Sequence, residues 1–487
     1  MESALGFISE FLGYGTNVVL PVIMFILCLA IGMKWSKALG AGLLLGIAFT
    51  GMNILFGFAF PALQGAGQAM IARFPTHPLP AFDLGWTVAS VISWAWPYAV
   101  FMFPLQIVIN IIMLWAGWTQ CLNVDMWNVW HKATLGAFVS ALLKNSFLGE
   151  SGALAMGFVV AAIWVVLELL SADYTREQVY SLTKIPGIAV SHNMLLDMIW
   201  MAPILDLIEK IPGIQNVKTS PADFRRRFGI LGENYILGGI LGLVFGLVAG
   251  FNLKDIATLV VSCAAILTIF PMMAGLFARA LAPVAEGAQE FMQKRFPGKA
   301  FYVGLDWPVL GGVDALWVTG IIAAPFILIF AAILPYNIVL PFGSIIAVSL
   351  IATTTVLAQG DVVKSSILAI IGVPVYLGAA SFFAPYLTDL AKATGVFETL
   401  AEGAQGYGMV TWLETNAAGM RLMVFAVLNM LNGQGFALGI GSLVVLAFSG
   451  WYYVRAMKRR ENAAAAASGG IAGNTRPYAD APAGAAD

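Results

Sequence analysis

Two histidines and one aspartate have the side chains best suited to bind a polar solute. Three histidines occur among the 487 residues, and His131 and His192 lie inside or beside stretches that are otherwise apolar. Ionisable side chains at bilayer depth are costly and are usually retained for a function. A neutral histidine offers one donor and one acceptor, and a carboxylate accepts from two hydroxyl groups, so His131, His192 and Asp306 suit recognition of a solute with several hydroxyl groups. Asp306 or a histidine could also accept the proton of a reacting hydroxyl group.

Further candidates lie in apolar segments that are interrupted by proline, glycine or clustered polar residues. Such breaks are common in transporters, where the freed backbone groups face a cavity. The interruptions predict three re-entrant hairpins, at residues 134–170, 185–208 and 304–312. We expect Asn193 and Glu150, which lie in two of these segments, to contact the solute. Trp86 is a further candidate, whose ring could stack on an apolar face of the solute.

Each candidate also has a purely structural interpretation. His131 is close to tryptophans and a lysine, a composition typical of the headgroup region. Asp306 lies two residues before a proline and could cap a helix. Glu150 could pair with Lys144 across a turn, and Trp86 could belong to the interfacial aromatic belt. These alternatives stay open at the level of the sequence.

The composition defines the class of protein. Hydrophobic residues make up 60% of the chain, charged residues make up 10%, and the mean hydropathy is +0.86. These values exclude a water-soluble domain. The uncharged runs reach or exceed the roughly 20 residues that span a bilayer as a helix, and they are too continuously apolar for barrel strands. We therefore expect an all-α polytopic membrane protein with about eleven transmembrane helices in addition to the re-entrant hairpins.

Clusters of lysine and arginine predict the orientation, because positive residues near helix ends remain in the cytoplasm. Such clusters occur within residues 218–227, 294–299 and 455–460, and these segments are assigned to the cytoplasmic side. A group of acidic residues that ends with Glu414 suits the outer face. The C-terminus is then cytoplasmic.

The chain is expected to form one membrane-embedded domain over residues 1–460, followed by a disordered, Ala-, Gly- and Pro-rich cytoplasmic tail over residues 461–487. The three cysteines share no CxxC spacing, so neither a metal site nor a disulfide framework is expected. The absence of a P-loop motif argues against an ATP-driven pump in this chain. The net charge of -1 is no indication of nucleic-acid binding, and no cofactor is expected.

Several motifs occur in an order that resembles one transporter family. The longest is Asn-Val-Asp-Met-Trp-Asn-Val-Trp-His at residues 123–131, followed by Gly-Ile-Ala-Val-Ser-His at 187–192 and Asp-Leu-Ile-Glu-Lys-Ile-Pro-Gly at 206–213. Shorter matches are found at residues 83–86, 224–229, 304–306 and 340–343. Over nearly the whole chain, these motifs resemble the galactitol-type enzyme IIC of the phosphoenolpyruvate-dependent sugar phosphotransferase system.

The resemblance implies a permease subunit in the bacterial inner (cytoplasmic) membrane, with the fold of the ascorbate- and galactitol-type enzymes IIC. It also implies an elevator motion, a homodimer, contact with membrane lipid, and IIA and IIB partners on separate chains. This subunit would hold galactitol or a related polyol and present one hydroxyl group to phosphorylated IIB. Because the phosphoryl group is carried by a cysteine of IIB, the chain is a component of a phosphotransferase complex, and its own status as an enzyme stays open.

One departure from the family pattern bears on the substrate. Where the family has Ile-Pro-His-Gly-Thr-Ser-Ala, this chain has Val-Ser-His-Asn-Met-Leu at residues 190–195, so another alditol or a related sugar is compatible. The competing hypothesis is a secondary transporter driven by protons or sodium. Its coupling carboxylate would be Glu150, Glu168 or Asp197.

Overall fold

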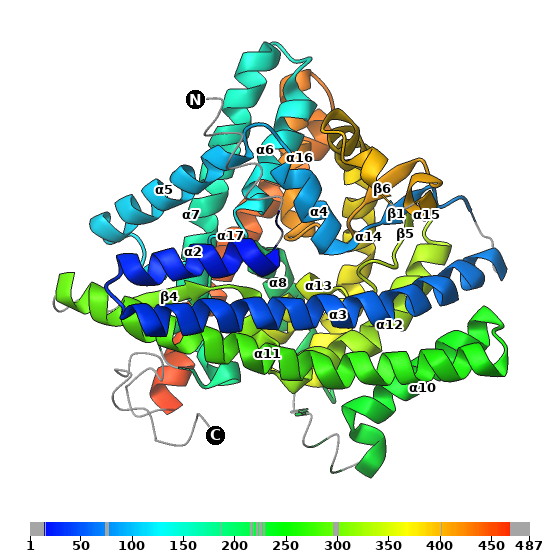
Figure 1. Cartoon of the computed structure of the whole chain (residues 1–487). Helices are drawn as coiled ribbons and strands as arrows, with labels where there is room; N and C mark the ends of the chain where they lie inside the picture. Colours follow the sequence, from blue (N-terminus) through cyan, green and yellow to red (C-terminus); the bar gives the residue numbers. More distant parts are fainter. Residues whose placement is uncertain are drawn as a thin grey trace.

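The computed structural model is built mainly from helices (Figure 1). It describes residues 14, 16–73, 77–185, 187–214, 217, 219–220, 223, 226, 229–295, 301–400 and 402–467. Five helices among the described residues are long and apolar enough to cross a membrane. They are residues Ala99–Ala116, α7 (Gly149–Thr183), α12 (Asp314–Ile333), α14 (Val362–Ala393) and the segment Phe436–Asn462 of α17 (Phe436–Ala467). Shorter apolar helices accompany them, and together they define a helical multi-pass membrane protein.

The two halves of the chain repeat one order of elements. The first half contains α2 (Thr16–Ala30), α3 (Trp35–Arg73), β1 (Ala81–Asp83), α4 (Gly85–Trp94), α5 (Met102–Ala116), β2 (Cys121–Asn123), α6 (Trp130–Leu143), α7, β3 (Ile188–Val190) and α8 (Met198–Ile208). The second half contains α10 (Asn234–Ala249), α11 (Leu253–Arg295), β4 (Tyr302–Leu305), α12, β5 (Val339–Leu340), α13 (Val348–Leu357), α14, β6 (Met409–Thr411) and α16 (Ala418–Asn429), and α17 follows. In each half, a helix pair is followed by a short strand, and a later helix pair separates the next two strands.

Single turns complete the described elements. They are η1 (Ala99–Phe101), η2 (Asn193–Asp197), η3 (Gly229–Gly232), η4 (Trp307–Leu310), η5 (Phe397–Thr399), η6 (Met430–Asn432) and α15 (Glu402–Gln405). The long helices α3 and α11 pack side by side across the molecule in Figure 1, with α2 against α3 and α10 against α11. The equivalent helix pairs of the two halves therefore form one layer.

The two halves also exchange their short strands. β1 of the first half lies between β5 and β6 of the second half, and β4 of the second half lies between β2 and β3 of the first half. All of these pairings are parallel, with Ala81 opposite Val339 and Gly304 opposite Asn123. Each sheet therefore joins both halves through backbone hydrogen bonds. The sequence analysis did not predict these strands, which have two to four residues each.

Two glycines allow close approach at the ends of the central strands. A Cβ atom on Gly304 would lie 2.6 Å from Cys121 Sγ and 2.6 Å from Ser191 Oγ. Gly85 has a φ of +71°, and a Cβ atom there would lie 2.8 Å from the carbonyl oxygen of Gly343. A larger residue at either position would force the neighbouring segments apart.

The predicted breaks coincide with helix ends, but the first one does not form a simple hairpin. α6 ends at Leu143, and α7 begins at Gly149 and continues without interruption to Thr183. Gly149 has a φ of +62° and starts the helix, whereas the following residues through Gly152 are helical. Residues 185–208 contain β3, η2 and α8, and residues 304–312 contain the end of β4 and η4, which lead into helices.

The C-terminal helix is longer than predicted. α17 continues to Ala467, so residues 461–467 are helical and are not part of a disordered tail. The side chain of Glu461 forms an ion pair with Arg176 of α7, which attaches this turn to the membrane domain. Residues 468–487 lie outside the described residues.

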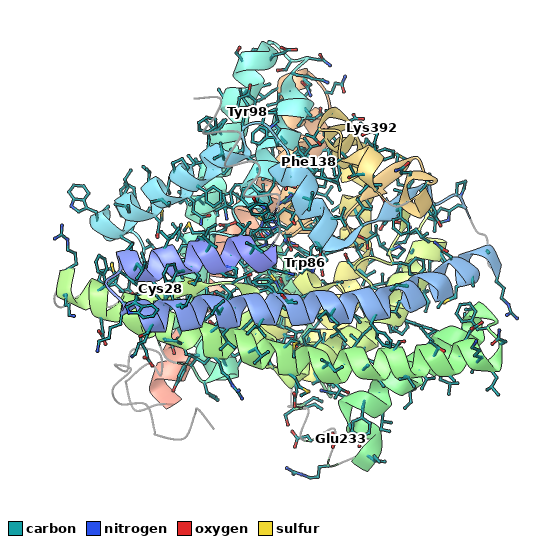
Figure 2. The ribbon with its side chains drawn as sticks, viewed as in Figure 1. Cys28, Trp86, Tyr98, Phe138, Glu233 and Lys392 are labelled. Atoms are coloured by element: carbon teal, nitrogen blue, oxygen red, sulfur yellow. The ribbon has the colours of Figure 1, made fainter. Side chains whose placement is uncertain are left out.

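Two charged ends of the molecule lie at opposite edges in the figures. Figure 2 places Glu233, which follows the cationic cluster of residues 218–227, at the lower edge of the molecule, and Lys392 near the opposite edge. The C-terminal end of α17 also lies at the lower edge in Figure 1. Arg225, Arg227 and Lys299 lie outside the described residues. The positive-inside rule predicts that the lower edge in these views faces the cytoplasm.

Candidate functional site

A narrow cavity lies where the short strands end and the short helices begin. Its lining comes from the segments that follow β1, β2, β3, β4 and β6 and from the start of α13. The lining residues are Trp86, Asn128, Trp130, His131, His192, Met194, Trp307, Val348, Ser349, Glu414 and Asn416. An adjoining cavity shares Trp86, Asn128 and Trp307 and adds Asp306. Carboxyl ends of parallel strands are a common location for ligand sites, and Figure 2 shows Trp86 near the middle of the molecule.

His131 and His192 face each other through their Nε2 atoms, which are 3.3 Å apart. The main-chain N–H of Met194 donates to Nδ1 of His192 at 3.2 Å. A neutral His192 ring with an accepting Nδ1 carries its proton on Nε2, so it donates toward His131. A ligand hydroxyl group that replaces the contact between the two rings would meet a donor on His192 and an acceptor on His131.

Two side chains of the second half extend this hydrogen-bonded chain. Nδ2 of Asn416 lies 2.8 Å from Nε2 of His131, and Oδ1 of Asn416 accepts from the hydroxyl group of Ser349. The ring of Trp412 stacks on His131 with a centroid separation of 5.6 Å and an interplanar angle of 13°. The position of the His131 ring is therefore set by residues from both halves of the chain.

Asp306 caps a helix and also lies near a histidine of the cavity, so it fits both roles that the sequence left open. Its Oδ1 accepts from the main-chain N–H of Trp307 at 2.6 Å, as the N-cap of η4. The same Oδ1 lies 3.9 Å from Nε2 of His192. The Asp306 side chain is 16% exposed, compared with 3% for His192, so it has an open face toward the adjoining cavity. A hydroxyl group could bridge the remaining gap to His192.

The motif at residues 123–131 is held by its own polar side chains. Oδ1 of Asn123 accepts from the main-chain N–H of Asp125 and from the hydroxyl group of Ser191, each at 2.9 Å. Asp125 accepts from the main-chain N–H of Asn128 at 3.2 Å and from its side chain at 2.6 Å. These bonds shape the loop that leads into α6, so Asn128 lines the cavity and His131 lies in the first turn of the helix.

Glu414 lies in the cavity lining and not on the outer face, contrary to the prediction from charge. The residue is 4% exposed, and its carboxylate accepts from the main-chain N–H of Val348 at the start of α13. The next residues, Thr415, Asn416 and Ala417, have φ values of +21°, +25° and +59°. Left-handed conformations are costly for residues with a Cβ and are concentrated at functional sites. This turn directs Asn416 back to His131.

Buried charges hold the first turn of α6 from behind the cavity. Lys132 forms an ion pair with Glu168 of α7, and its Nζ donates to the carbonyl oxygen of Asn128 at 3.5 Å. Nη2 of Arg421, from α16, donates to the carbonyl oxygen of His131 at 3.4 Å. Both cations are 1% exposed and are absent from the described cavity lining. They contact the backbone that carries the candidate ligands.

The structure brings together His131, His192, Asp306 and Trp86, but it places the two other candidates elsewhere. Glu150 is exposed in the first turn of α7 and is not in the described lining of either cavity. Asn193 is fully buried outside that lining, and its side-chain amide has no hydrogen-bond partner among the described residues. Trp86 is half-buried and lines both cavities.

Sequence reasoning missed Ser349, Glu414 and Asn416. The polar group Glu-Thr-Asn at residues 414–416, directly before an apolar helix, was the available signal. Its partners lie far away along the chain, because β6 and β3 end at the same cavity although they belong to different sheets. Only the strand exchange makes these positions neighbours.

Two carboxylates of the competing hypothesis have structural partners. Asp197 accepts from Nε1 of Trp200 at 2.7 Å and from the main-chain N–H of Met420 at 3.0 Å, in the first turn of α16. Glu168 is paired with Lys132. A carboxylate at a helix N-terminus satisfies free backbone donors, so these residues have clear roles in holding helices.

Comparison with known proteins identifies the family of this chain. Residues 10–400 match the family described as PTS system sugar-specific permease component. The chain belongs to this permease family. A provisionally named permease IIC component of Escherichia coli (strain K12) is 34% identical over 396 residues, which cover 81% of this chain and 88% of the relative. The galactitol-specific EIIC component of the same organism's PTS is 30% identical over 407 residues, with coverages of 82% and 88%.

The resemblance to galactitol-type enzyme IIC is thus confirmed. As a PTS permease component, the chain belongs to a system that implies IIA and IIB partners and a sugar substrate. The cavity of this permease offers hydrogen-bond donors and acceptors next to tryptophan rings, a combination suited to the hydroxyl groups and C–H faces of a sugar or polyol.

Proposed function

We propose that this PTS permease binds galactitol or a related alditol in the cavity, carries it across the bacterial inner membrane and presents it to phosphorylated IIB. The observation that carries the proposal is the hydrogen-bonded chain from Asn416 through His131 to His192, with Asp306 beyond it. These side chains can donate to and accept from hydroxyl groups, and a polyol that lacks one of them would leave a buried polar group without a partner. Trp86 and Trp307 supply apolar surface.

Asp306 is the proposed base for the phosphorylated hydroxyl group. The hydroxyl oxygen forms a bond to phosphorus, its proton moves to the Asp306 carboxylate, and the bond from phosphorus to the IIB cysteine breaks with release of the thiolate. Positioning supplies most of the catalysis in phosphoryl transfer. The exposed face of Asp306 supports this role, because it leaves an acceptor oxygen open to a ligand.

We also propose that the protein is a homodimer with an elevator motion, as the resemblance implies. The strand exchange supports movement of the cavity as one body, because both halves contribute to each sheet and to the cavity lining. A hollow beneath this body is lined by the end of α8, the α13–α14 turn and α17, on the side assigned to the cytoplasm. This is a suitable place for IIB to approach.

The test is uptake of radiolabelled alditols into membrane vesicles, with and without phosphoenolpyruvate and the soluble phosphotransfer proteins. We expect phosphoenolpyruvate-dependent accumulation of a phosphorylated alditol, and its loss in His192→Ala. His77→Ala is the matched control, because His77 contacts the carbonyl oxygen of Asn337 and is not in the described cavity lining. Accumulation of unmodified solute under an imposed ion gradient would instead support the secondary transporter.

A further inference from the structure

The C-terminal part of α17 carries a surface stripe that changes from apolar to cationic. Val444, Phe448 and Trp451 are 63%, 54% and 51% exposed, respectively. Arg455 and Lys458 continue the stripe, because steps of three or four residues remain on one helix face. The stripe lies in the second half of the apolar segment Phe436–Asn462 and ends at the side assigned to the cytoplasm.

A shallow groove accompanies the cationic end of this stripe. It is lined by Trp451, Tyr452, Arg455, Lys458, Arg459 and Asn462, and none of these described residues is acidic. The guanidinium group of Arg455 lies over the indole ring of Trp451, 4.2 Å from the ring centroid. Stacking of this kind orients a guanidinium group and leaves its N–H edge available to an oxyanion.

Two further arginines of α17, of which Arg459 also borders the groove, are engaged in a separate network. Arg459 and Arg460 donate to the carboxylate of Asp206 at 3.0 and 3.1 Å, and the hydroxyl group of Tyr452 donates to it at 2.6 Å. These contacts attach α17 to α8. They leave Arg455 and Lys458 as the cations of the groove that point away from this network.

We propose that the groove binds the phosphate headgroup of an anionic phospholipid, whose acyl chains lie along Val444 and Phe448. Arginine binds phosphate oxygens in a bidentate manner, lysine adds charge, and tryptophan favours the headgroup depth. Basic sites at the cytoplasmic ends of transmembrane helices attract anionic lipid. A soluble acidic protein would match the cations but would not cover the exposed apolar residues that continue directly from them. The proposal does not depend on the transported substrate.

The test is native mass spectrometry of the full chain equilibrated with mixed micelles of phosphatidylglycerol and phosphatidylcholine. For the double variant Arg455→Gln, Lys458→Gln we expect a roughly 30-fold loss of the preference for phosphatidylglycerol, since each cation near the surface contributes about fivefold. The matched control is Lys34→Gln, Lys37→Gln, which flank the 67% exposed Trp35 at another helix end. This control should retain the preference. Arg455→Lys keeps the charge but lacks the planar guanidinium group that stacks on Trp451. Its preference for phosphatidylglycerol should fall by less than fivefold.

Four results would overturn the proposal. The double variant could retain the preference, or the control could lose it to the same extent, which would make the effect one of general surface charge. Glycerol 3-phosphate could displace phosphatidylglycerol at equal concentration, which would show that the acyl chains add nothing. Alternatively, the double variant could keep its lipid preference and lose phosphorylation by IIB, which would assign the groove to the protein partner. An unchanged unfolding temperature in phosphatidylcholine shows that the variants are folded.

Discussion

Two aspartates occupy corresponding ends of the exchanged sheets, yet their surroundings differ. Asp83 ends the central strand β1 and is fully buried. It accepts from the main-chain N–H groups of Gly85, Ser344 and Leu413, at 3.1, 2.8 and 3.0 Å. The carboxylate thereby joins the end of β1 to two loops of the second half.

Asp306 follows the central strand β4 and is the counterpart in the other sheet. Among the described residues, its main-chain donor is the N–H group of Trp307, and its remaining face borders the cavity near His192. The comparison shows that saturation by donors distinguishes a carboxylate that holds loops together from one that is available to a ligand. Topological position alone does not make this distinction.

The largest expected effect on stability concerns a third buried carboxylate, Glu168, whose partner is a buried cation and not a set of N–H donors. Glu168→Gln removes the ion-pair partner of the buried Lys132, and we expect a loss of about 3 to 5 kcal/mol in the free energy of unfolding. Denaturant titration of the purified protein in detergent measures it. Lys132→Met combined with Glu168→Met should restore much of the loss, because neither charge then remains. If Glu168→Gln has the unfolding free energy of the wild type, the ion pair does not contribute to stability.

Asp83→Asn should lower the free energy of unfolding by about 3 kcal/mol, because an amide cannot accept from all of the converging N–H donors. The same titration measures the change. Asp306→Asn is the matched control, since asparagine caps a helix as well as aspartate does. Equal destabilisation by Asp83→Asn and Asp306→Asn would show that the two aspartates contribute equally to stability.

Asp306→Asn should instead lower the rate of substrate phosphorylation by about 100-fold, the lower range for a lost general base. The unfolding free energy should stay close to that of the wild type. Phosphoenolpyruvate-dependent phosphorylation in vesicles measures the rate, and equilibrium binding of the labelled alditol separates chemistry from affinity. A wild-type rate would limit Asp306 to its role as a helix cap.

The smallest effect is expected for Ser349→Ala. Loss of the hydroxyl donor to Asn416 should raise the KM for the alditol about fivefold, as expected for one hydrogen bond. Ser366→Ala is the control, because Ser366 is buried outside the described cavity lining and its hydroxyl group has no described hydrogen-bond partner. Equal KM values for the two variants would show that Asn416 needs no support from Ser349.

Local features of the sequence predicted the helical membrane class and the interruptions of some apolar segments. Breaks at residues 144–149 and 304–312 are visible because glycine, proline and polar residues interrupt apolar runs. The strands escaped prediction, because two to four residues are too few to show a period. Their stability comes from partners such as Ala81 and Val339, which are distant in the sequence.

The candidate site was predictable only in its first-half members and Asp306. His131 and His192 stand out as rare ionisable residues in apolar surroundings. Glu414 and Asn416 have equally polar side chains, but the density of acidic residues before them suggested an exposed segment. Their burial depends on β6 pairing with β1 and on the left-handed turn that follows.

The sequence by itself determined that this chain spans a membrane as helices, because hydrophobicity acts locally along the chain and each long run is sufficient for its own insertion. It also determined the family, through motifs that keep their order. The tertiary structure decided which polar residues share a cavity and which carboxylates are saturated by donors. Those properties depend on the exchange of strands between the halves, and a contact between distant segments has no local signature in either of them.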